Sequence, residues 1–315
     1  MSTRRLATGG LIDRSKPITF SWDGKKRSGY SGDTLASALI ANGDRVVGRS
    51  FKYHRPRGVM SAGVEESGAI VTVGAGSRTE PNVKATVQEL YDGLVARGQN
   101  AWPSVRFDLG AVNNVLGRFL AAGFYYKTFM GIPPFEWGSG TGMWMRYERM
   151  IRKAAGMGEA SRLPDPDHYE HAHAFCDLLV VGAGPSGIAA AQAAAESGLN
   201  VVLVEQDSLL GGTQLSTPSC GSELIPSVEE LESMGVRVMT RTTVFGLYDY
   251  SVAGLLERVT DHLPDPPDYL PRHRFWTLRS KYTIVAAGAL ERHIAFGNND
   301  RPGVMTAAAV RTYMN

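Results

Sequence analysis

The sequence predicts an α+β domain followed by an α/β domain. Residues 17–76 show a strand pair, a helix and further strands in that order, whereas residues 168–315 show short apolar strands around a helix. A glycine-rich turn at 182–187 joins the first of these apolar strands to the helix. A chain of 315 residues is long enough for two such domains.

The composition is that of an ordinary globular protein, with 43% apolar residues, 20% charged residues and a formal net charge of +2. This charge indicates neither a nucleic-acid partner nor a membrane surface. The two cysteines, Cys176 and Cys220, are too few for a disulfide framework or a four-thiolate site. The first residues lack the apolar segment of a secretory signal, so we expect a cytoplasmic protein.

Residues 1–16 are expected to form a basic N-terminal arm, solvated or in contact with an acidic partner. Residues 18–22 then alternate like a half-buried strand, and Asp23-Gly24 is a hairpin turn signal before a returning strand at 26–30. Asp33 or Thr34 caps a helix that continues to Ala41. With further strands at 46–47 and 69–73, this pattern predicts a β-grasp domain over 17–76.

A glycine-rich loop follows this helix, in an order similar to that of the plant-type 2Fe–2S ferredoxins. Such a cluster needs four thiolates, and residues 17–76 contain no cysteine, so we predict a domain without an iron–sulfur cluster and without a metal. The basic residues of the loop either grip a phosphate or carboxylate or hold the neighbouring acids. These basic residues are Lys52, His54, Arg55 and Arg57, and the acids are Glu65 and Glu66.

Residues 77–167 are expected to be a connecting region. Residues 83–94 have helical spacing, and the aromatic segment 129–144 is expected to lie over another domain or subunit. A Pro-Asp-Pro-Asp linker precedes three closely spaced histidines, His168, His171 and His173. We expect these histidines to have a linker or interface role rather than to bind a metal, because the segment leads into a strand.

Residues 177–205 predict one complete β-α-β unit. An apolar strand runs into the sequence Gly182-Ala183-Gly184-Pro185-Ser186-Gly187, an alanine-rich helix follows, and a second apolar strand at 201–204 ends at Glu205. Strand, turn, helix, strand and terminal acid in this register indicate a dinucleotide site more specifically than the glycines alone.

Each residue type in this unit has a physical role in binding a dinucleotide. Gly182 permits the tight turn, Gly184 lets the backbone approach a pyrophosphate, and Gly187 lets the helix pack on the strand. The helix N-terminus at Pro185 and Ser186 attracts phosphate. Glu205 accepts hydrogen bonds from a ribose diol and repels a 2′-phosphate, which favours NAD or FAD over NADP.

Two further segments are expected beside the same ligand. Gly212 and Thr213 lie in a turn that closes over a bound cofactor, and Ala287 and Gly288 follow a buried strand at 282–285. Other strands are expected at 236–239, 242–248 and 274–278. The chain stops inside an expected helix soon after the strand at 282–285, so we expect a dinucleotide domain over 168–315 that is truncated at its C-terminus.

The chain resembles the α subunits of heterotetrameric sarcosine oxidases. The resemblance is carried by residues 51–63 (FKYHRPRGVMSAG), 177–205, 211–214 (GGTQ), 242–249 (TTVFGLYD) and 286–315, and it covers almost the whole chain. It implies a β-grasp domain followed by a nucleotide domain of the disulfide-reductase type. It also implies NAD in this chain, with FAD as the alternative, and FAD and FMN associated with the β subunit or its interface.

The family activity implied is the oxidation of sarcosine to glycine with oxygen as acceptor, giving hydrogen peroxide and a one-carbon unit for tetrahydrofolate. The implied partners are the β, γ and δ subunits. Related amine and opine dehydrogenases place four cysteines in the β-grasp loop, and this chain lacks them.

Two other interpretations stay open. One is a self-contained FAD enzyme of the pyridine nucleotide-disulfide reductase class, although Cys220 has no partner at a redox-pair spacing. The other is an assembly module with a vestigial nucleotide site. Because no Ser-His-Asp set, paired-carboxylate site or metal cluster stands out, no residue is assigned a catalytic role, and we expect the chain alone to be inactive.

Overall fold

The computed structural model describes residues 4–51, 53–116, 148–149, 152, 156–217 and 225–315. Lys52, the aromatic segment 129–144 and Cys220 therefore lie outside the described residues. The chain divides into two compact units. The first comprises Met1–Ala7, Leu11–Pro164 and His293–Ala309, and the second comprises Thr8–Gly10, Asp165–Arg292 and Val310–Asn315.

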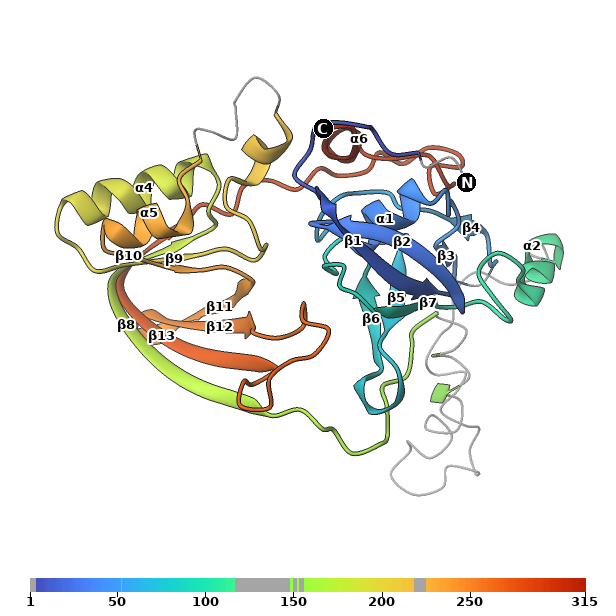
Figure 1. Cartoon of the computed structure of the whole chain (residues 1–315), viewed down its shortest axis with the longest axis horizontal. Coiled ribbons are helices and arrows are strands. Elements are labelled where there is room, and N and C mark those ends of the chain that lie inside the picture. The colour runs from blue at the N-terminus through green and yellow to red at the C-terminus, as the bar shows by residue number, and fades with distance from the viewer. Residues whose placement is uncertain (1–3, 52, 117–147, 150–151, 153–155, 218–224) are drawn as a thin grey trace, which may run out of the picture. The chain divides into compact units, whose positions relative to one another are not determined.

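The first unit is a β-grasp domain (Figure 1). Its five-stranded sheet has the order β2-β1-β7-β5-β6, in which β1 and β7 are parallel neighbours and β1 and β2 form an antiparallel hairpin. Its elements are β1 (Asp13–Trp22), β2 (Lys25–Ser31), α1 (Leu35–Ala41), β3 (Gly48–Arg49), β4 (Pro56–Arg57), β5 (Ile70–Val73), β6 (Glu80–Lys84), β7 (Val95–Gly98) and α2 (Val112–Leu116).

Local chemistry explains the hairpin and the helix. Asp23 and Gly24 both have positive φ, as the two-residue turn between Trp22 and Lys25 requires, which confirms the predicted hairpin. Thr34 is the N-cap of α1, and its side chain and that of Ser37 form a reciprocal capping box. The helix buries its apolar face, including Leu35, Ala38 and Leu39.

Two features of the first unit differ from expectation. The sheet continues past residue 76, because β6 and β7 complete it, and residues 83–94 form the end of β6 and turns instead of a helix. The basic arm is also partly anchored: the two terminal guanidinium nitrogens of Arg5, Nη1 and Nη2, donate to the buried carboxylate of Asp33, at 3.0 and 2.7 Å.

The second unit contains a Rossmann sheet with strand order β10-β9-β8-β13-β12-β11. Strands β10, β9, β8 and β13 are parallel neighbours, whereas β12 and β11 continue the sheet as an antiparallel meander. Its elements are β8 (Tyr169–Val181), α4 (Pro185–Glu196), β9 (Val201–Val204), α5 (Val228–Ser233), β10 (Val236–Met239), β11 (Thr242–Tyr248), β12 (Val252–Arg258) and β13 (His273–Val285), and α6 (Ala307–Met314) follows in the chain.

Two apolar cores hold this sheet. Leu178 and Val180 of β8 pack with Ile188 of α4 and Leu231 of α5, so the helices cover one face. On the other face, residues of β8 and β9 pack with Leu255 of β12 and with residues of β13. In Figure 1, α4 and α5 accordingly lie on the opposite side of the parallel strands from β11 and β12.

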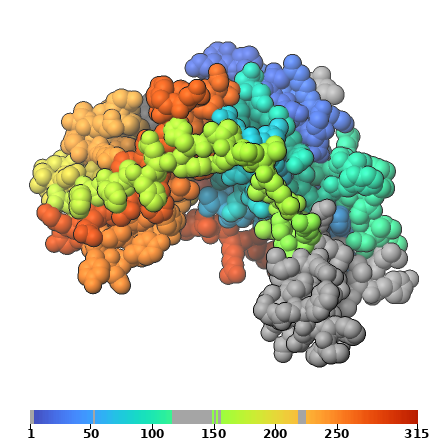
Figure 2. Space-filling view, turned by 90° about the horizontal axis from the view of Figure 1, so that it is seen from below, coloured from blue at the N-terminus to red at the C-terminus, as the bar shows by residue number. Residues whose placement is uncertain are grey.

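The strands β8 and β13 are each 13 residues long and pair along their whole length. The expected strands at 274–278 and 282–285 are therefore one strand. Lys281 lies between them and its amine is 2.7 Å from the carboxylate of Asp177 on β8. Figure 2 shows β8, in yellow-green, at the surface of the molecule, in agreement with the exposed side chains of Tyr169 and Phe175.

The C-terminal part of the chain does not all belong to the second unit. Residues His293–Ala309 group with the first unit, whereas the sequence predicts one domain over residues 168–315. Several contacts support this placement: the carboxylate of Asp300 pairs with arginines of the β-grasp loop, and the N–H of Thr306 donates to the carbonyl of Met60. Within the described part of the chain, no helix combines the length and apolar character needed to cross a membrane.

Candidate functional site

The turn after β8 has the backbone geometry that its glycines permit. Gly182 has φ +100°, and a Cβ there would lie 2.5 Å from the carbonyl oxygen of Ala286. A Cβ on Gly187 would collide with the carbonyl oxygen of Gly182, so a larger residue cannot occupy either position without a backbone shift. By contrast, a Cβ on Gly184 would meet no atom within 4 Å. The turn is therefore packed against backbone at Gly182 and Gly187, whereas the space beside Gly184 is open.

Helix α4 begins at this opening. Gly184 is its N-cap residue, Pro185 follows at the first helical position, and Ser186 is exposed in the first turn. The first N–H groups of a helix have no partner within the helix and carry a partial positive charge. Twelve residues of helix stand behind this end. The arrangement suits a phosphate group.

Glu205 lies directly after β9 and is 8% exposed. One carboxylate oxygen accepts a hydrogen bond from the N–H of Ala183 at 2.7 Å, and the other accepts one from the N–H of Asp207 at 3.1 Å. The side chain therefore reaches from the end of the second strand to the glycine turn. A carboxylate has about four acceptor positions, so two hydrogen bonds leave capacity for hydroxyl donors.

The other two predicted segments lie beside the same turn. The N–H of Gly211 donates to the carbonyl of Ala183 at 2.8 Å, and a Cβ on Gly212 would lie 3.2 Å from the Cα of Gly184. Thr213 is exposed next to it. A Cβ on Gly182 would also lie 3.1 Å from the Cα of Ala287, on the segment after β13.

The structure thus places the ten predicted residues at the carboxyl ends of β8, β9 and β13, with Gly288 exposed at the end of the last segment. This edge of a parallel sheet is where α/β proteins bind ligands. Sequence reasoning missed Ala183, whose N–H and carbonyl connect Glu205 to Gly211. Ala183 contributes only backbone groups, so its residue type could not indicate this role. Its position inside the glycine motif is the one signal in the sequence.

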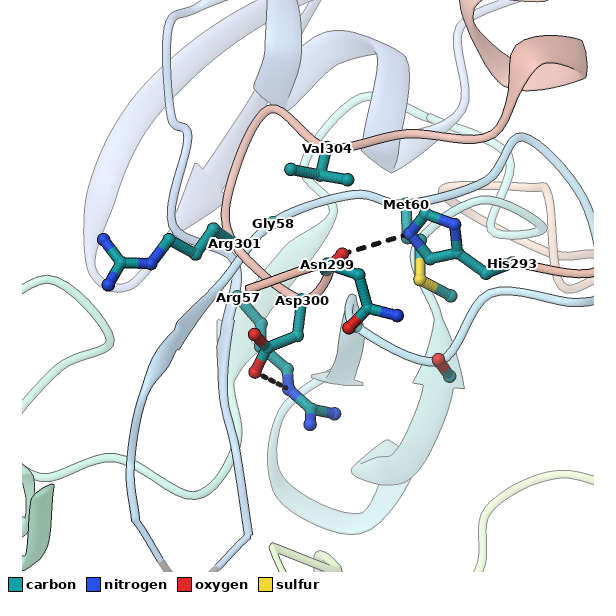
Figure 3. A pocket seen from close by; sticks show the side chains of 10 residues that line it. Arg57, Gly58, Met60, His293, Asn299, Asp300, Arg301 and Val304 are labelled. Carbon is teal, nitrogen blue, oxygen red and sulfur yellow. Dashed lines mark hydrogen bonds and ion pairs between the residues drawn. The ribbon is translucent and has the colours of Figure 1, made fainter. Parts of the chain in front are cut away.

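The basic loop of the β-grasp domain forms a separate pocket of about 220 Å³ (Figure 3). Asp300 lies 2.7 Å from the guanidinium of Arg55 and 3.6 Å from Nε of Arg57, so among the described residues it is the acid that pairs with both. The longer distance exceeds that of a hydrogen bond. His54 instead contacts the buried carboxylate of Asp108 at 2.7 Å.

The histidines that precede the Rossmann unit belong to, or adjoin, β8. His171 and His173 are both exposed and pair with Phe275 and Thr277 of β13, and the ring of His171 lies 4.7 Å from that of Phe275. His168 precedes the strand, and its carbonyl accepts a hydrogen bond from Arg272. In the described ranges, no three His, Cys, Asp or Glu side chains are grouped so that they could hold a metal ion.

Two family models match the chain. Residues 15–101 match a 2Fe-2S iron-sulfur cluster binding domain, and residues 177–254 match a FAD dependent oxidoreductase. Both cysteines of the chain lie outside the first range, so the matched residues contain no thiolate that could hold a cluster. The second range covers the glycine turn, Glu205 and the meander strand β11.

A solved structure supports the fold. L-proline dehydrogenase from P. horikoshii is 19% identical, with a TM-score of 0.58 over 96% of this chain and 47% of its own. At this identity the likeness concerns the fold alone.

Curated relatives match the chain from end to end. The sarcosine oxidase subunit alpha of Rhizobium meliloti is 51% identical over 323 residues, which is 100% of this chain and 32% of the relative. That of a Corynebacterium species is 34% identical over 319 residues, which is 98% of this chain and 27% of the relative. The chain thus spans about a third of the length of these relatives, and it belongs to the family of sarcosine oxidase α subunits.

Proposed function

We propose that this chain is the NAD-binding part of the α subunit of a multi-subunit sarcosine oxidase. The observation that carries the proposal is the contact between Glu205 and the glycine turn, because it joins an acid suited to a ribose with a backbone suited to a pyrophosphate. The names of the relatives supply the reaction class.

The residues of the turn fit an adenine dinucleotide. Backbone can approach a pyrophosphate at Gly184, where a Cβ would meet open space, and the first turn of α4 offers N–H donors at Ser186 and Gly187. The spare acceptor positions of Glu205 suit a ribose diol, and its charge repels a 2′-phosphate. Gly212, Thr213, Ala287 and Gly288 would border the same ligand.

The chemistry would belong to the complete assembly. It would oxidise the C–N bond of sarcosine, release glycine and pass two electrons to oxygen, giving hydrogen peroxide and a one-carbon unit for tetrahydrofolate. A bound nicotinamide supplies a hydride donor or acceptor. This chain would bind and orient the dinucleotide, whereas FAD and FMN would be held mainly by the β subunit or its interface. The partners proposed are the β, γ and δ subunits.

The second candidate is FAD in the same site of a self-contained oxidoreductase. The match of residues 177–254 to a FAD dependent oxidoreductase favours it. An enzyme of the disulfide-reductase class also needs a reactive thiol, and Cys176 is poorly suited because burial raises its pKa to about 11. The third candidate, an assembly module, predicts no nucleotide binding at all.

We propose a cytoplasmic location, which agrees with the free thiol of Cys176.

Titration of the purified chain with NAD, NADP and FAD by calorimetry separates these candidates. We expect NAD to bind more tightly than NADP. In Glu205→Gln, NAD affinity should fall by about ten- to a hundred-fold, because hydrogen bonds to a charged acceptor are each worth roughly 1.5–3 kcal/mol.

Glu205→Arg should shift the preference toward NADP, since a cation attracts the 2′-phosphate. The matched control is Glu196→Gln, an exposed acid at the other end of α4, which should leave all affinities unchanged. Tight FAD binding without NAD binding would favour the second candidate, and no binding would favour the third.

A further inference from the structure

Glu66 is a buried acid that the proposed nucleotide site does not use. It is 2% exposed and lies in the loop between β4 and β5 of the β-grasp domain. One carboxylate oxygen accepts hydrogen bonds from the N–H groups of Met60 and Ser61, each at 2.8 Å. The other accepts from the N–H groups of Gly68 and Ala69, at 2.5 and 2.9 Å. Four backbone donors therefore converge on one carboxylate.

These backbone dipoles are the main partners of the charge. No Lys, Arg or His among the described residues forms an ion pair with Glu66, so the carboxylate is compensated by the loop itself. Successive backbone N–H groups that point into one concavity form an anion-binding nest. Leaving such donors unpaired in a buried position destabilises the fold.

The surrounding backbone is packed closely around the carboxylate. A Cβ on Gly68 would lie 2.5 Å from the carbonyl oxygen of Gly58 and 3.2 Å from a carboxylate oxygen of Glu66. Ser61 and Ala69 are both 0% exposed. The nest is thus filled by a side chain of the chain itself.

The loop that surrounds Glu66 lies inside residues 15–101, which match a 2Fe-2S cluster binding domain. A cluster of that type needs four thiolates, and this range contains no cysteine. Iron–sulfur clusters also accept hydrogen bonds from backbone N–H groups at their sulfurs. The residues of this range therefore cannot hold a cluster. Backbone N–H donors of the loop nevertheless converge on one anion, the carboxylate of Glu66.

We propose that the carboxylate of Glu66 is the anion around which this loop folds, in place of a metal cluster. The β-grasp domain then reaches its folded state from the polypeptide alone. This inference is independent of which nucleotide the second unit binds, because every residue that carries it lies in the first unit.

The test measures deuterium exchange of the amides of the loop in the full chain. In the wild-type chain, the peptides that contain Met60, Ser61, Gly68 and Ala69 should be protected. Glu66→Ala should remove this protection and lower the Tm of the β-grasp unit by roughly 10 °C, since several hydrogen bonds are lost at once. Glu65→Ala is the matched control, one residue away, and it should retain both properties.

Rescue by a small carboxylate distinguishes an anion site from a simple loss of packing. Formate should restore protection of the four amides in Glu66→Ala in a saturable way, whereas chloride at equal ionic strength should not. Glu66→Gln, which keeps the shape but presents an NH2 group to one pair of donors, should lose protection at that pair only. This variant also supplies the readout if Glu66→Ala fails to fold.

Three results would overturn the proposal. The first is stoichiometric iron and acid-labile sulfide in wild-type protein purified without oxygen. The second is unchanged amide protection in both Glu66 variants. The third is loss of protection in Glu66→Ala that formate does not restore.

Discussion

Two buried carboxylates, those of Glu66 and Glu205, accept hydrogen bonds from backbone N–H groups of glycine-rich loops. Glu66 accepts four such bonds, which fills the acceptor capacity of a carboxylate. Glu205 accepts two, from Ala183 and Asp207. The same chemistry therefore suits the first acid to a structural role and leaves the second able to bind hydroxyl groups.

The thiol of Cys176 is expected to be unreactive in the folded protein. Its thiol is 7% exposed, and burial, together with the charge of Asp177, raises its pKa to about 11. The thiolate is the reactive form, so in the folded protein at pH 8 we expect almost no reaction with iodoacetamide, whereas the urea-unfolded chain should react fully. Mass spectrometry of the peptide containing Cys176 measures both. Rapid modification of this peptide in the native protein would contradict the assignment.

The contacts of Asp261 should make the free energy of unfolding depend on pH. Burial alone would raise the pKa of this carboxyl, but its contacts with His273 at 2.7 Å and Arg272 at 2.8 Å outweigh burial and hold the pKa below its ordinary value. A lowered folded-state pKa stabilises the protein above the unfolded-state pKa of about 4, and this contribution is lost as the pH falls through the folded-state pKa.

Asp261→Asn should therefore lower the free energy of unfolding at pH 7, and the difference from wild type should shrink below about pH 4. Urea denaturation at a series of pH values measures this difference. Asp265→Asn, at an exposed position in the loop after Asp261, is the control and should show a small, pH-independent effect. A difference that stays constant down to pH 2 would contradict the prediction.

The β-α-β unit could be predicted because its signals are local. The apolar run before Gly182, the glycines and the alanines of α4 each act within a few residues, and the structure has strand, turn and helix where expected. The first half of β8 could not be predicted in this way. Its sequence alternates polar residues with alanine, and its strand conformation depends on pairing with β13, about 100 residues later.

The same contrast applies in the β-grasp domain. Residues 83–94 have helical spacing, yet Val83 and Lys84 pair with Val71 and Ile70 of β5. Tertiary pairing overrides a short periodic pattern of this kind. Arg5 is a second example, because nothing in residues 1–16 indicates that its partner is the buried Asp33.

The C-terminal part of strand β13 has an exposed edge. Beyond Arg279, its edge away from β8 has no paired strand in the described part of the chain. The side chains of Tyr282, Ile284 and Val285 are 71%, 41% and 64% exposed. An exposed apolar edge promotes association through added strands. We therefore expect the isolated chain to self-associate as its concentration rises.

Tyr282→Lys should reduce this association, because a charged side chain on an edge strand opposes pairing. Light scattering after size-exclusion chromatography measures it over a range of concentrations. Ala193→Lys, which adds the same charge on the exposed side of α4, is the control and should behave like wild type. Equal association in both variants would show that this edge is not responsible.

Along its length, the chain passes from the first unit to the second near Asp165 and returns to the first at His293. The return could not be predicted from the sequence, because residues 293–304 contain neither a helical nor a strand pattern. Their placement depends on Asp300, whose partner Arg55 is 245 residues away in the chain. Long-range ion pairs of this kind leave no local signal.

The chain alone is not expected to oxidise sarcosine. The site at the ends of β8 and β9 is proposed to hold NAD, and a nicotinamide does not readily pass electrons to oxygen, whereas a flavin does. Sarcosine-dependent peroxide formation should therefore be absent from the purified chain, and the protein should lack flavin absorbance.

A peroxidase-coupled assay and the visible spectrum check these expectations. Activity should appear when the chain is supplied, as part of a full-length α subunit, with the proposed β, γ and δ subunits, of which β is proposed to hold the flavins. The control is that assembly with Gly187→Val in α, because a side chain at Gly187 collides with the carbonyl of Gly182 and should abolish NAD binding while leaving the flavins in place. A yellow chain that forms peroxide from sarcosine without any partner would contradict both the NAD assignment and the subunit role.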